Sequence, residues 1–305
     1  GADGCGLLRT EFAFVDRLDR QSAPSEDDQA ARYQQIADAL QGRPLVIRTL
    51  DAGGDKPLPY LPGAREDNPA LGVRGVRLGL RHPELLRAQL RAILRVVPGG
   101  VCRIIVPMIA SPAELRAVRA MLDEERRALG VPAVPLGAMI EVPVAALGAQ
   151  ALAADCELFS IGTNDLAQYA LAMDRGNRDV AAGLDSLEPG VLRLIASTVR
   201  GARLRDRPVS VCGGAAADPG AAAIFVGLGI RTLSVAPAAL PELKAWLRTL
   251  SAARAAELAS RALELDSAGE VRALIASALP ATQITHSTET TPPRQPLSSQ
   301  LAQRA

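Results

Sequence analysis

The chain has 305 residues, of which 48% are hydrophobic, 22% charged and only 3% aromatic. This length allows one large domain or two ordinary ones, and the composition is typical of a folded protein with an aliphatic core. Because 34 basic and 33 acidic residues leave a net charge of +1, the sequence offers no broad field for nucleic acid or an acidic membrane, and few rings that could stack on bases.

Neither membrane insertion nor a cysteine-based metal site is indicated. The most apolar long stretch, residues 136–154, contains Glu141 and Pro143 and is short for a membrane span. No signal peptide is recognisable. The four cysteines show no CxxC spacing and only two histidines are present, which disfavours a zinc site or a redox pair. A reducing cytoplasm is therefore the expected location.

Seven short aliphatic or β-branched runs are predicted as strands, and longer segments rich in Ala, Leu, Arg and Glu lie between them. This alternation is typical of βα units around a largely parallel sheet, and each connection is long enough for a right-handed crossover. Helical patterns include residues 25–40, 83–94, 111–129 and 189–204, several of them opened by Ser or Pro. The predicted strands are residues 6–10, 44–49, 102–108, 136–141, 158–162, 208–213 and 232–236.

Two segments depart from this alternation. Residues 50–73 form a long connection rich in Gly and Pro, of a kind that is more often functional than idle. Within it, DAGGDK lacks the full pattern of a nucleotide-binding loop, but it places Lys56 on a flexible segment close to Arg48. Residues 281–305 are rich in Ser, Thr, Pro and Gln without an apolar period, which predicts a disordered tail after a domain at residues 1–280.

Polar residues end several of the predicted strands. They are Arg9, Arg48, Glu141, Asn164, Asp165 and Cys212. In a βα barrel this edge is the catalytic face, where side chains from different strands converge. One interpretation is that the arginines and carboxylates pair with one another as structural ion pairs. The other is a ligand site, because two carboxylates suit Mg²⁺ and several arginines suit a small ligand that carries phosphate and carboxylate groups. The set as a whole favours phosphoryl chemistry.

Seven segments form a recognisable series, which runs GCGLLRTEF (4–12), VIRTLDAGGDK (46–56), NPALGVRGVRL (68–78), RIIVPMI (103–109), MIEVPVAA (139–146), FSIGTNDLAQYALAMDRGN (159–177) and VCGG (211–214). This series resembles the motifs of the phosphoenolpyruvate (PEP)-binding barrel of enzyme I of the bacterial sugar phosphotransferase system, or PEP-protein phosphotransferase. The resemblance runs in order over nearly all of residues 1–250. The second segment favours enzyme I over pyruvate phosphate dikinase and PEP synthase, which stay open as alternatives.

The resemblance implies a (β/α)8 barrel of the TIM type that binds PEP with Mg²⁺ and releases pyruvate. It implies that Glu141 and Asp165 bind Mg²⁺, and that Cys212 protonates the enolate carbon as pyruvate forms. The implied contacts to the phosphate and carboxylate of PEP come from Arg9, Arg48, Asn164 and Arg175, with Arg74 and Lys56 completing the anion cage.

The resemblance also implies partners. The family's phosphorylated histidine lies on a separate N-terminal domain, and neither His82 at a predicted helix start nor His286 in the tail suits that role. We therefore expect the chain to act with such a domain and, through it, with the phosphocarrier protein HPr, and to form a homodimer. Where the family reads CGE, this chain reads Cys212, Gly213 and Gly214. The missing carboxylate keeps a non-catalytic PEP sensor open as an alternative.

The number of strands leads to one further expectation. Only seven strands are counted, and the chain begins at what resembles the second strand unit of the family. An eight-stranded barrel without its first strand has an open edge and an exposed core. We therefore expect a truncated barrel that is poorly soluble or dependent on a partner when it is expressed alone.

Overall fold

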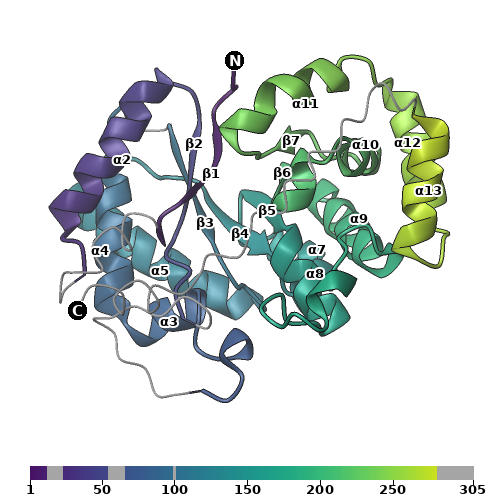
Figure 1. The fold of residues 1–305 in the computed structure, drawn as a ribbon. Coiled ribbons are helices and arrows are strands. Elements are labelled where there is room, and N and C mark those ends of the chain that lie inside the picture. Colours follow the sequence, from purple (N-terminus) through teal and green to yellow (C-terminus); the bar gives the residue numbers. More distant parts are fainter. Residues whose placement is uncertain (12–22, 54–65, 99–100, 280–305) are drawn as a thin grey trace, which may run out of the picture.

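The computed structural model describes residues 1–11, 23–53, 66–98 and 101–279. Two of the predictions, the position of Lys56 and the tail at residues 281–305, lie outside these ranges. The helices and strands that the structure describes follow the order expected for repeated βα units (Figure 1).

Seven parallel strands form a single sheet in the order of the sequence, each paired with the next. All seven predicted strands are confirmed, although the last is shorter than expected. Their bounds are β1 (Cys5–Arg9), β2 (Leu45–Arg48), β3 (Cys102–Val106), β4 (Leu136–Ile140), β5 (Leu158–Gly162), β6 (Val209–Cys212) and β7 (Thr232–Leu233). The sheet curls into a nearly closed barrel, as the βα alternation predicted.

Helices cover the outside of the sheet (Figure 1). Sequence signals set several of their ends: Ser25 and Ser111 cap α2 and α5, each in a reciprocal capping box with an acidic residue three positions later. The helices are α2 (Glu26–Leu40), α3 (Val76–Arg81), α4 (Pro83–Leu94), α5 (Pro112–Leu129), α6 (Pro143–Leu147), α7 (Ala149–Leu152), α8 (Thr163–Leu171), α9 (Pro189–Arg203), α10 (Pro219–Leu228), α11 (Leu240–Leu247), α12 (Ala252–Ala262) and α13 (Ala268–Ala278).

The two edge strands approach each other. Within the described ranges no ladder pairs β1 with β7, but a Cβ atom placed on Gly6 would lie 2.8 Å from Cβ of Ser234, just after β7. The N-terminal segment also lies beside α11, where Lys244 Nζ donates a hydrogen bond to the carbonyl oxygen of Gly1 at 2.7 Å. The seam of the barrel is therefore held by contacts of small residues and by the N-terminal segment.

The core has two parts, because successive strand residues point to opposite faces of the sheet. The larger part lies between the sheet and the helices and includes Leu45 and Ile47 of β2. A small cluster fills the barrel interior, and it contains Val46, Ile105, Met139, Leu158 and Cys212. Apolar packing inside the barrel is thus limited, which leaves its carboxyl end to polar side chains. In the described part of the chain, none of the helices combines the length and apolarity needed to cross a bilayer.

Candidate active site

The candidate site begins where β1 and β2 end. Arg9 and Arg48 are register partners in the β1–β2 ladder, so the parallel pairing brings the two guanidinium-bearing positions side by side. The Thr10 hydroxyl donates to the carbonyl oxygen of Arg48 at 2.9 Å and ties the two strand ends together. Arg48 is buried, whereas the Arg9 side chain is 47% exposed. One arginine therefore forms the floor of the site and the other its rim.

Glu11 is the carboxylate that organises this pair. Its Oε2 lies 2.7 Å from Nη2 of Arg48 and 3.4 Å from Nε of Arg9. Its Oε1 accepts a hydrogen bond from the backbone N–H of Asp51 at 3.1 Å. Glu11 therefore joins the end of β1 to the loop that follows β2.

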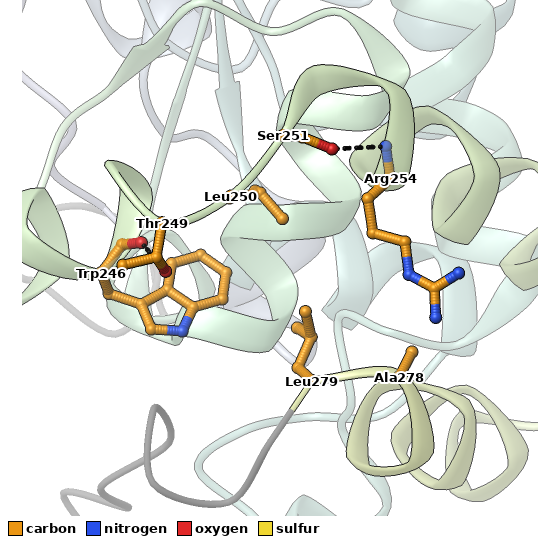
Figure 2. A pocket seen from close by; sticks show the side chains of 7 residues that line it. All are labelled: Trp246, Thr249, Leu250, Ser251, Arg254, Ala278 and Leu279. Atoms are coloured by element: carbon orange, nitrogen blue, oxygen red, sulfur yellow. Dashed lines mark hydrogen bonds between the residues drawn. The ribbon is translucent and has the colours of Figure 1, made fainter.

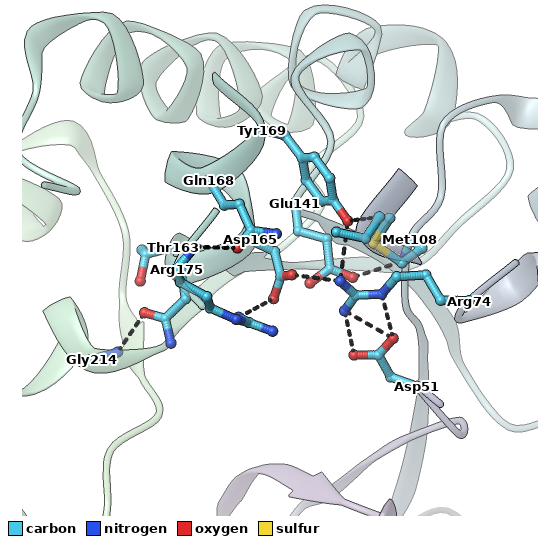
Figure 3. A network of polar contacts seen from close by, with 12 residues as sticks. Asp51, Arg74, Met108, Glu141, Thr163, Asp165, Gln168, Tyr169, Arg175 and Gly214 are labelled. Carbon is cyan, nitrogen blue, oxygen red and sulfur yellow. Dashed lines mark hydrogen bonds and ion pairs between the residues drawn. The ribbon is translucent and has the colours of Figure 1, made fainter. Parts of the chain in front are cut away.

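Arg74 extends the network across the barrel (Figure 3). It is 1% exposed and lies between two carboxylates, with Nη2 at 2.9 Å from Oδ2 of Asp51 and Nη1 at 3.0 Å from Oδ1 of Asp165. Nη1 also donates to the Tyr169 hydroxyl at 3.1 Å. Such a buried arginine needs its opposite charges, because an unpaired guanidinium would carry a large desolvation cost.

Asn164 and Asp165 lie in the first turn of α8, directly after β5. The other oxygen of Asp165, Oδ2, is 3.2 Å from Nη1 of Arg175. Asn164 is exposed, and its Oδ1 accepts a hydrogen bond from the backbone N–H of Gly214 at 3.1 Å. The α8 start thus places a carboxylate and an amide at the same edge as the strand-end arginines.

Glu141 follows β4 and is completely buried. Its Oε1 accepts a hydrogen bond from the backbone N–H of Met108 at 2.7 Å, while Oε2 has no hydrogen-bond partner in the described residues. Burial, reinforced by the neighbouring Asp165 and Asp51, raises the pKa of Glu141 to about 8. A Cβ atom on Gly162 would lie 2.8 Å from Oε2, so only a glycine leaves room for this carboxylate.

Cys212 ends β6 inside the barrel. The Ser160 hydroxyl donates to its sulfur at 3.8 Å, and the thiol donates to the carbonyl oxygen of Ile161 at 3.4 Å. Burial raises the pKa of Cys212 to about 11. The side chain is therefore a neutral thiol near neutral pH and carries a proton into a region lined by charged groups.

Two buried atoms of opposite character lack partners at this edge. Four buried side-chain nitrogen or oxygen atoms in the described residues have no hydrogen bond, and two of them are Nε of Arg48 and Oε2 of Glu141. One is a donor on a cation, and the other belongs to a carboxyl group that becomes an anionic acceptor when it loses its proton. A ligand that presents an anionic group together with a metal cation would satisfy both.

The structure thus brings together Arg9, Arg48, Arg74, Glu141, Asn164, Asp165, Arg175 and Cys212, and Lys56 lies outside the described residues. The predicted alternative, in which the strand-end arginines and carboxylates pair with one another, is wrong in its partners: Arg9 and Arg48 pair with Glu11, and Asp165 pairs with Arg74 and Arg175. Sequence reasoning missed Glu11, Asp51 and Tyr169. The first two follow strand-end arginines within three positions, a signal that could have indicated them.

A pocket of about 270 Å³ lies elsewhere, between α11, the start of α12 and the end of α13 (Figure 2). Trp246, Leu250 and Leu279 contribute apolar surface, and Thr249, Ser251, Arg254 and Ala278 complete the lining. None of the predicted site residues lines this pocket. Convergent charge at the strand ends, and not concavity, therefore locates the candidate active site.

Comparison with known proteins shows the family of the chain. A family model described as "PEP-utilising enzyme, PEP-binding domain" matches residues 1–252. The chain belongs to this family. It is 50% identical over 275 residues to a multiphosphoryl transfer protein of Xanthomonas campestris and 51% identical over 274 residues to one of Rhodobacter capsulatus. It is also 39% identical over 281 residues to a PEP-protein phosphotransferase of Haemophilus influenzae.

These alignments cover 90% of this chain in each case. They cover only 32% and 33% of the two multiphosphoryl transfer proteins and 48% of the phosphotransferase. The chain therefore spans about a third of the length of the two multiphosphoryl transfer proteins and about half of the length of the phosphotransferase.

Proposed function

We propose that the chain is the PEP-binding domain of a PEP-dependent protein-histidine phosphotransferase. It would take the phosphoryl group from PEP, in a Mg²⁺-dependent step, for the sugar phosphotransferase system. The observation that carries the proposal is the convergence of three buried or half-buried arginines, Arg48, Arg74 and Arg175, on two carboxylates at the strand ends. The relatives named PEP-protein phosphotransferase support the same reaction.

The charge pattern suits PEP. PEP carries a phosphate and a carboxylate on a three-carbon frame, and guanidinium groups bind both kinds of oxyanion bidentately. Arg48 has an unpartnered buried Nε, and Arg9 and Asn164 stand at the exposed rim. We propose that Arg9, Arg48, Arg175 and Asn164 hold the two anionic groups, with Arg74 and Lys56 completing the cage.

A divalent cation fits the carboxylates. In the described residues no cluster of three or more His, Cys, Asp or Glu side chains could hold a metal by protein ligands alone. Mg²⁺, however, typically takes one or two carboxylates together with substrate phosphate oxygens and water. Oε2 of Glu141 has no hydrogen-bond partner in the described residues. Burial, Asp165 and Asp51 together raise the pKa of this carboxyl group although Arg48 acts in the opposite direction, so a further cation would stabilise its charged form. We propose Glu141 and Asp165 as the residues that bind Mg²⁺, which would stabilise charge on the transferring phosphoryl group.

The proposed transfer moves the phosphoryl group of PEP to a histidine. The bond between phosphorus and the enol oxygen of PEP breaks, and a bond forms between phosphorus and a histidine nitrogen presented by a separate domain. The enolate that remains takes a proton at its methylene carbon and becomes pyruvate. The Cys212 thiol supplies that proton, since its raised pKa keeps it protonated until a strongly basic carbanion is formed beside it.

The partners of this reaction belong to the same proposal. They are the phosphohistidine domain, the phosphocarrier protein HPr beyond it, and a second copy of the chain in a homodimer. We propose a cytoplasmic location, because PEP is an intracellular metabolite and the four cysteines of the chain are free thiols.

Calorimetry with PEP, in the presence and absence of Mg²⁺, tests the binding step. We expect binding that depends on Mg²⁺ and is lost in Arg48→Met, because this change removes a buried guanidinium from the floor of the site. Arg116→Met is a matched control. Arg116 lies on the outer helix α5, where its exposed side chain forms an ion pair with Asp155. Absence of PEP binding to the wild-type chain would refute the proposal.

Addition of a separately expressed histidine domain tests the transfer step. Pyruvate release that disappears in Cys212→Ala, but persists in Cys102→Ala, supports the enzyme and the role of Cys212. Cys102 is also buried, but it lies at the amino end of β3, whereas Cys212 lies at the carboxyl end of β6. Binding of PEP without pyruvate release would instead favour a non-catalytic sensor, which the glycine at position 214 makes a specific rival.

A further inference from the structure

A chain of four hydrogen bonds runs through the interior from the end of β2 to the start of α2. The Leu50 backbone N–H donates to Oε1 of Gln89 at 2.8 Å, and Nε2 of Gln89 donates to the Tyr33 hydroxyl at 3.1 Å. That hydroxyl donates to Oε1 of Gln29 at 3.2 Å, and Nε2 of Gln29 donates to the carbonyl oxygen of Pro24 at 3.1 Å. The three side chains are between 1% and 3% exposed.

The direction of every bond in this chain is determined by its two ends. The Leu50 N–H can only donate, so Gln89 must present its oxygen there and its NH₂ group to Tyr33. The Pro24 carbonyl can only accept, so Gln29 must present its NH₂ group there and its oxygen to Tyr33. The tyrosine hydroxyl therefore accepts on one side and donates on the other, and all four bonds point the same way. Aligned chains of this kind reinforce one another.

The surroundings of Gln89 show that packing alone does not require a polar residue. Gln89 shares a small apolar gap with Leu78, Leu85 and Leu86, and its helix α4 is otherwise buried through aliphatic side chains. A buried amide in such a setting is costly unless its hydrogen bonds are made. The backbone N–H of Leu50, which needs an acceptor, explains why a glutamine occupies position 89.

The Leu50 end of this chain meets the candidate active site. Leu50 directly precedes Asp51, whose backbone N–H donates to Glu11 and whose carboxylate contacts Arg48 at 3.4 Å and Arg74 at 2.9 Å. A shift of the backbone at Leu50 would therefore move the carboxylate that orients both arginines. The Pro24 end lies just before Ser25, the N-cap of α2, on the connection that follows β1 and Arg9.

We propose that Gln89 and Tyr33 are positioning residues: through the Leu50 backbone they hold Asp51 in place, and through Asp51 they orient Arg48 and Arg74 for the anionic substrate. The consequence for PEP binding rests on the proposed function, whereas the consequence for the Leu50 backbone does not. Burial raises the pKa of Tyr33 above its ordinary value, so the hydroxyl keeps the proton that the chain requires.

Two variants and a control test the proposal in the full chain. Gln89→Met removes the acceptor for Leu50 with little change in side-chain length. Tyr33→Phe leaves that acceptor in place but removes the group that fixes it, one bond away from Leu50. Ile93→Val on the same helix α4 is the control, because Ile93 is 1% exposed and belongs only to the apolar core.

The first readout is amide hydrogen exchange at Leu50 and Asp51 without ligand. We expect exchange to be accelerated about tenfold or more in Gln89→Met and severalfold in Tyr33→Phe, beyond the change in Ile93→Val at matched global stability. If exchange in Tyr33→Phe is no faster than in Ile93→Val, the positioning role of Tyr33 is overturned. If exchange in Gln89→Met is no faster either, the whole proposal is overturned.

The second readout is the affinity for PEP with Mg²⁺. We expect about a tenfold weaker Kd in Tyr33→Phe and less than about a twofold change in Ile93→Val. Unchanged affinity in Tyr33→Phe, with wild-type binding intact, would overturn the link from the backbone to the arginines. A wild-type chain that does not bind PEP would refute the proposed function instead, and the exchange measurement would still decide whether Gln89 and Tyr33 hold the Leu50 backbone.

Discussion

Nη1 of Arg74 lies 3.0 Å from Oδ1 of Asp165, although 91 positions separate the two residues in the sequence. Arg74 also pairs with Asp51, so it connects the loop after β2 to the first turn of α8. We expect Arg74→Met to destabilise the fold by about 3–5 kcal/mol, because it leaves the carboxylates of Asp51 and Asp165 buried without their shared cation. Urea unfolding measures this loss.

A second substitution sharpens this test. Asp51→Asn in the Arg74→Met background should recover part of the loss, since it removes one of the two carboxylate charges that Arg74 no longer offsets. Arg116→Met should cost no more than about 1 kcal/mol, as is usual for an exposed ion pair. An Arg74→Met variant that unfolds at the wild-type urea concentration would show that the buried pair contributes nothing to stability.

Glu141 gives the metal-free protein a pH-dependent weakness. Burial and the adjacent Asp165 raise its pKa to about 8, above the value of about 4.3 expected in the unfolded chain. The folded state therefore binds a proton more tightly, and the contribution of Glu141 to stability falls as the pH rises between these values. We expect Glu141→Gln to raise the melting temperature without Mg²⁺, with a gain that grows up to about pH 8.

Two comparisons accompany that measurement. Mg²⁺ should raise the melting temperature of the wild type but not of Glu141→Gln. Glu125→Gln should act in the opposite direction and lower stability near neutral pH: although burial alone would raise the pKa of Glu125, hydrogen bonds from Arg87 and Arg91 lower it. A Glu141→Gln curve that runs parallel to the wild type at every pH would refute this account of the site.

Cys212 should react slowly with alkylating agents. Burial raises its pKa to about 11, even though the hydrogen bond from Ser160 acts in the opposite direction, and its side chain is 5% exposed. Cys5 is half-buried, so we expect iodoacetamide at pH 8 to modify it at least about tenfold faster than Cys212, because the thiolate is the reacting form. Peptide mass spectrometry over time measures both rates. The two rates should become similar only when urea unfolds the protein. Equal rates in the folded protein would contradict the burial of the Cys212 thiol.

Two neighbouring glycines should respond differently to alanine. Gly213 has φ +102°, and a Cβ atom there would lie 2.3 Å from Oγ1 of Thr163. We therefore expect Gly213→Ala to cost about 1–3 kcal/mol or more in thermal or urea unfolding. At Gly214 the nearest atom to an added Cβ is Oδ1 of Asn164 at 3.7 Å, an ordinary contact.

Gly214→Ala and Gly214→Glu should consequently fold as the wild type does. The second variant also restores the carboxylate that resembles the family pattern, so comparison of its pyruvate release with that of the wild type tests whether the glycine limits turnover. Equal stability of Gly213→Ala and Gly214→Ala would contradict the backbone conformation described for this turn.

The sequence by itself determined the secondary structure and its order, because these depend on local patterns. Six of the seven strands and the helices that begin at Glu26, Pro83, Pro112 and Pro189 agree with the predicted runs to within one or two residues. The short run of β7 is the main difference: residues 234–236 continue the apolar pattern, but the strand ladder ends at Leu233. Strand-end positions also indicated Arg48, Glu141 and Cys212, since parallel strands place their carboxyl ends at one edge.

Only the tertiary structure decided which charges meet. Arg74 comes from the connection after β2 and Asp165 from the start of α8, and no local pattern joins them; they meet because the barrel curls and both are buried together. The same holds for the bond from Gln89 to Leu50, which spans 39 positions. Periodicity shows which side chains face inward, but the partner of a buried polar group depends on the packing of elements far apart in the chain, since each such group must find one.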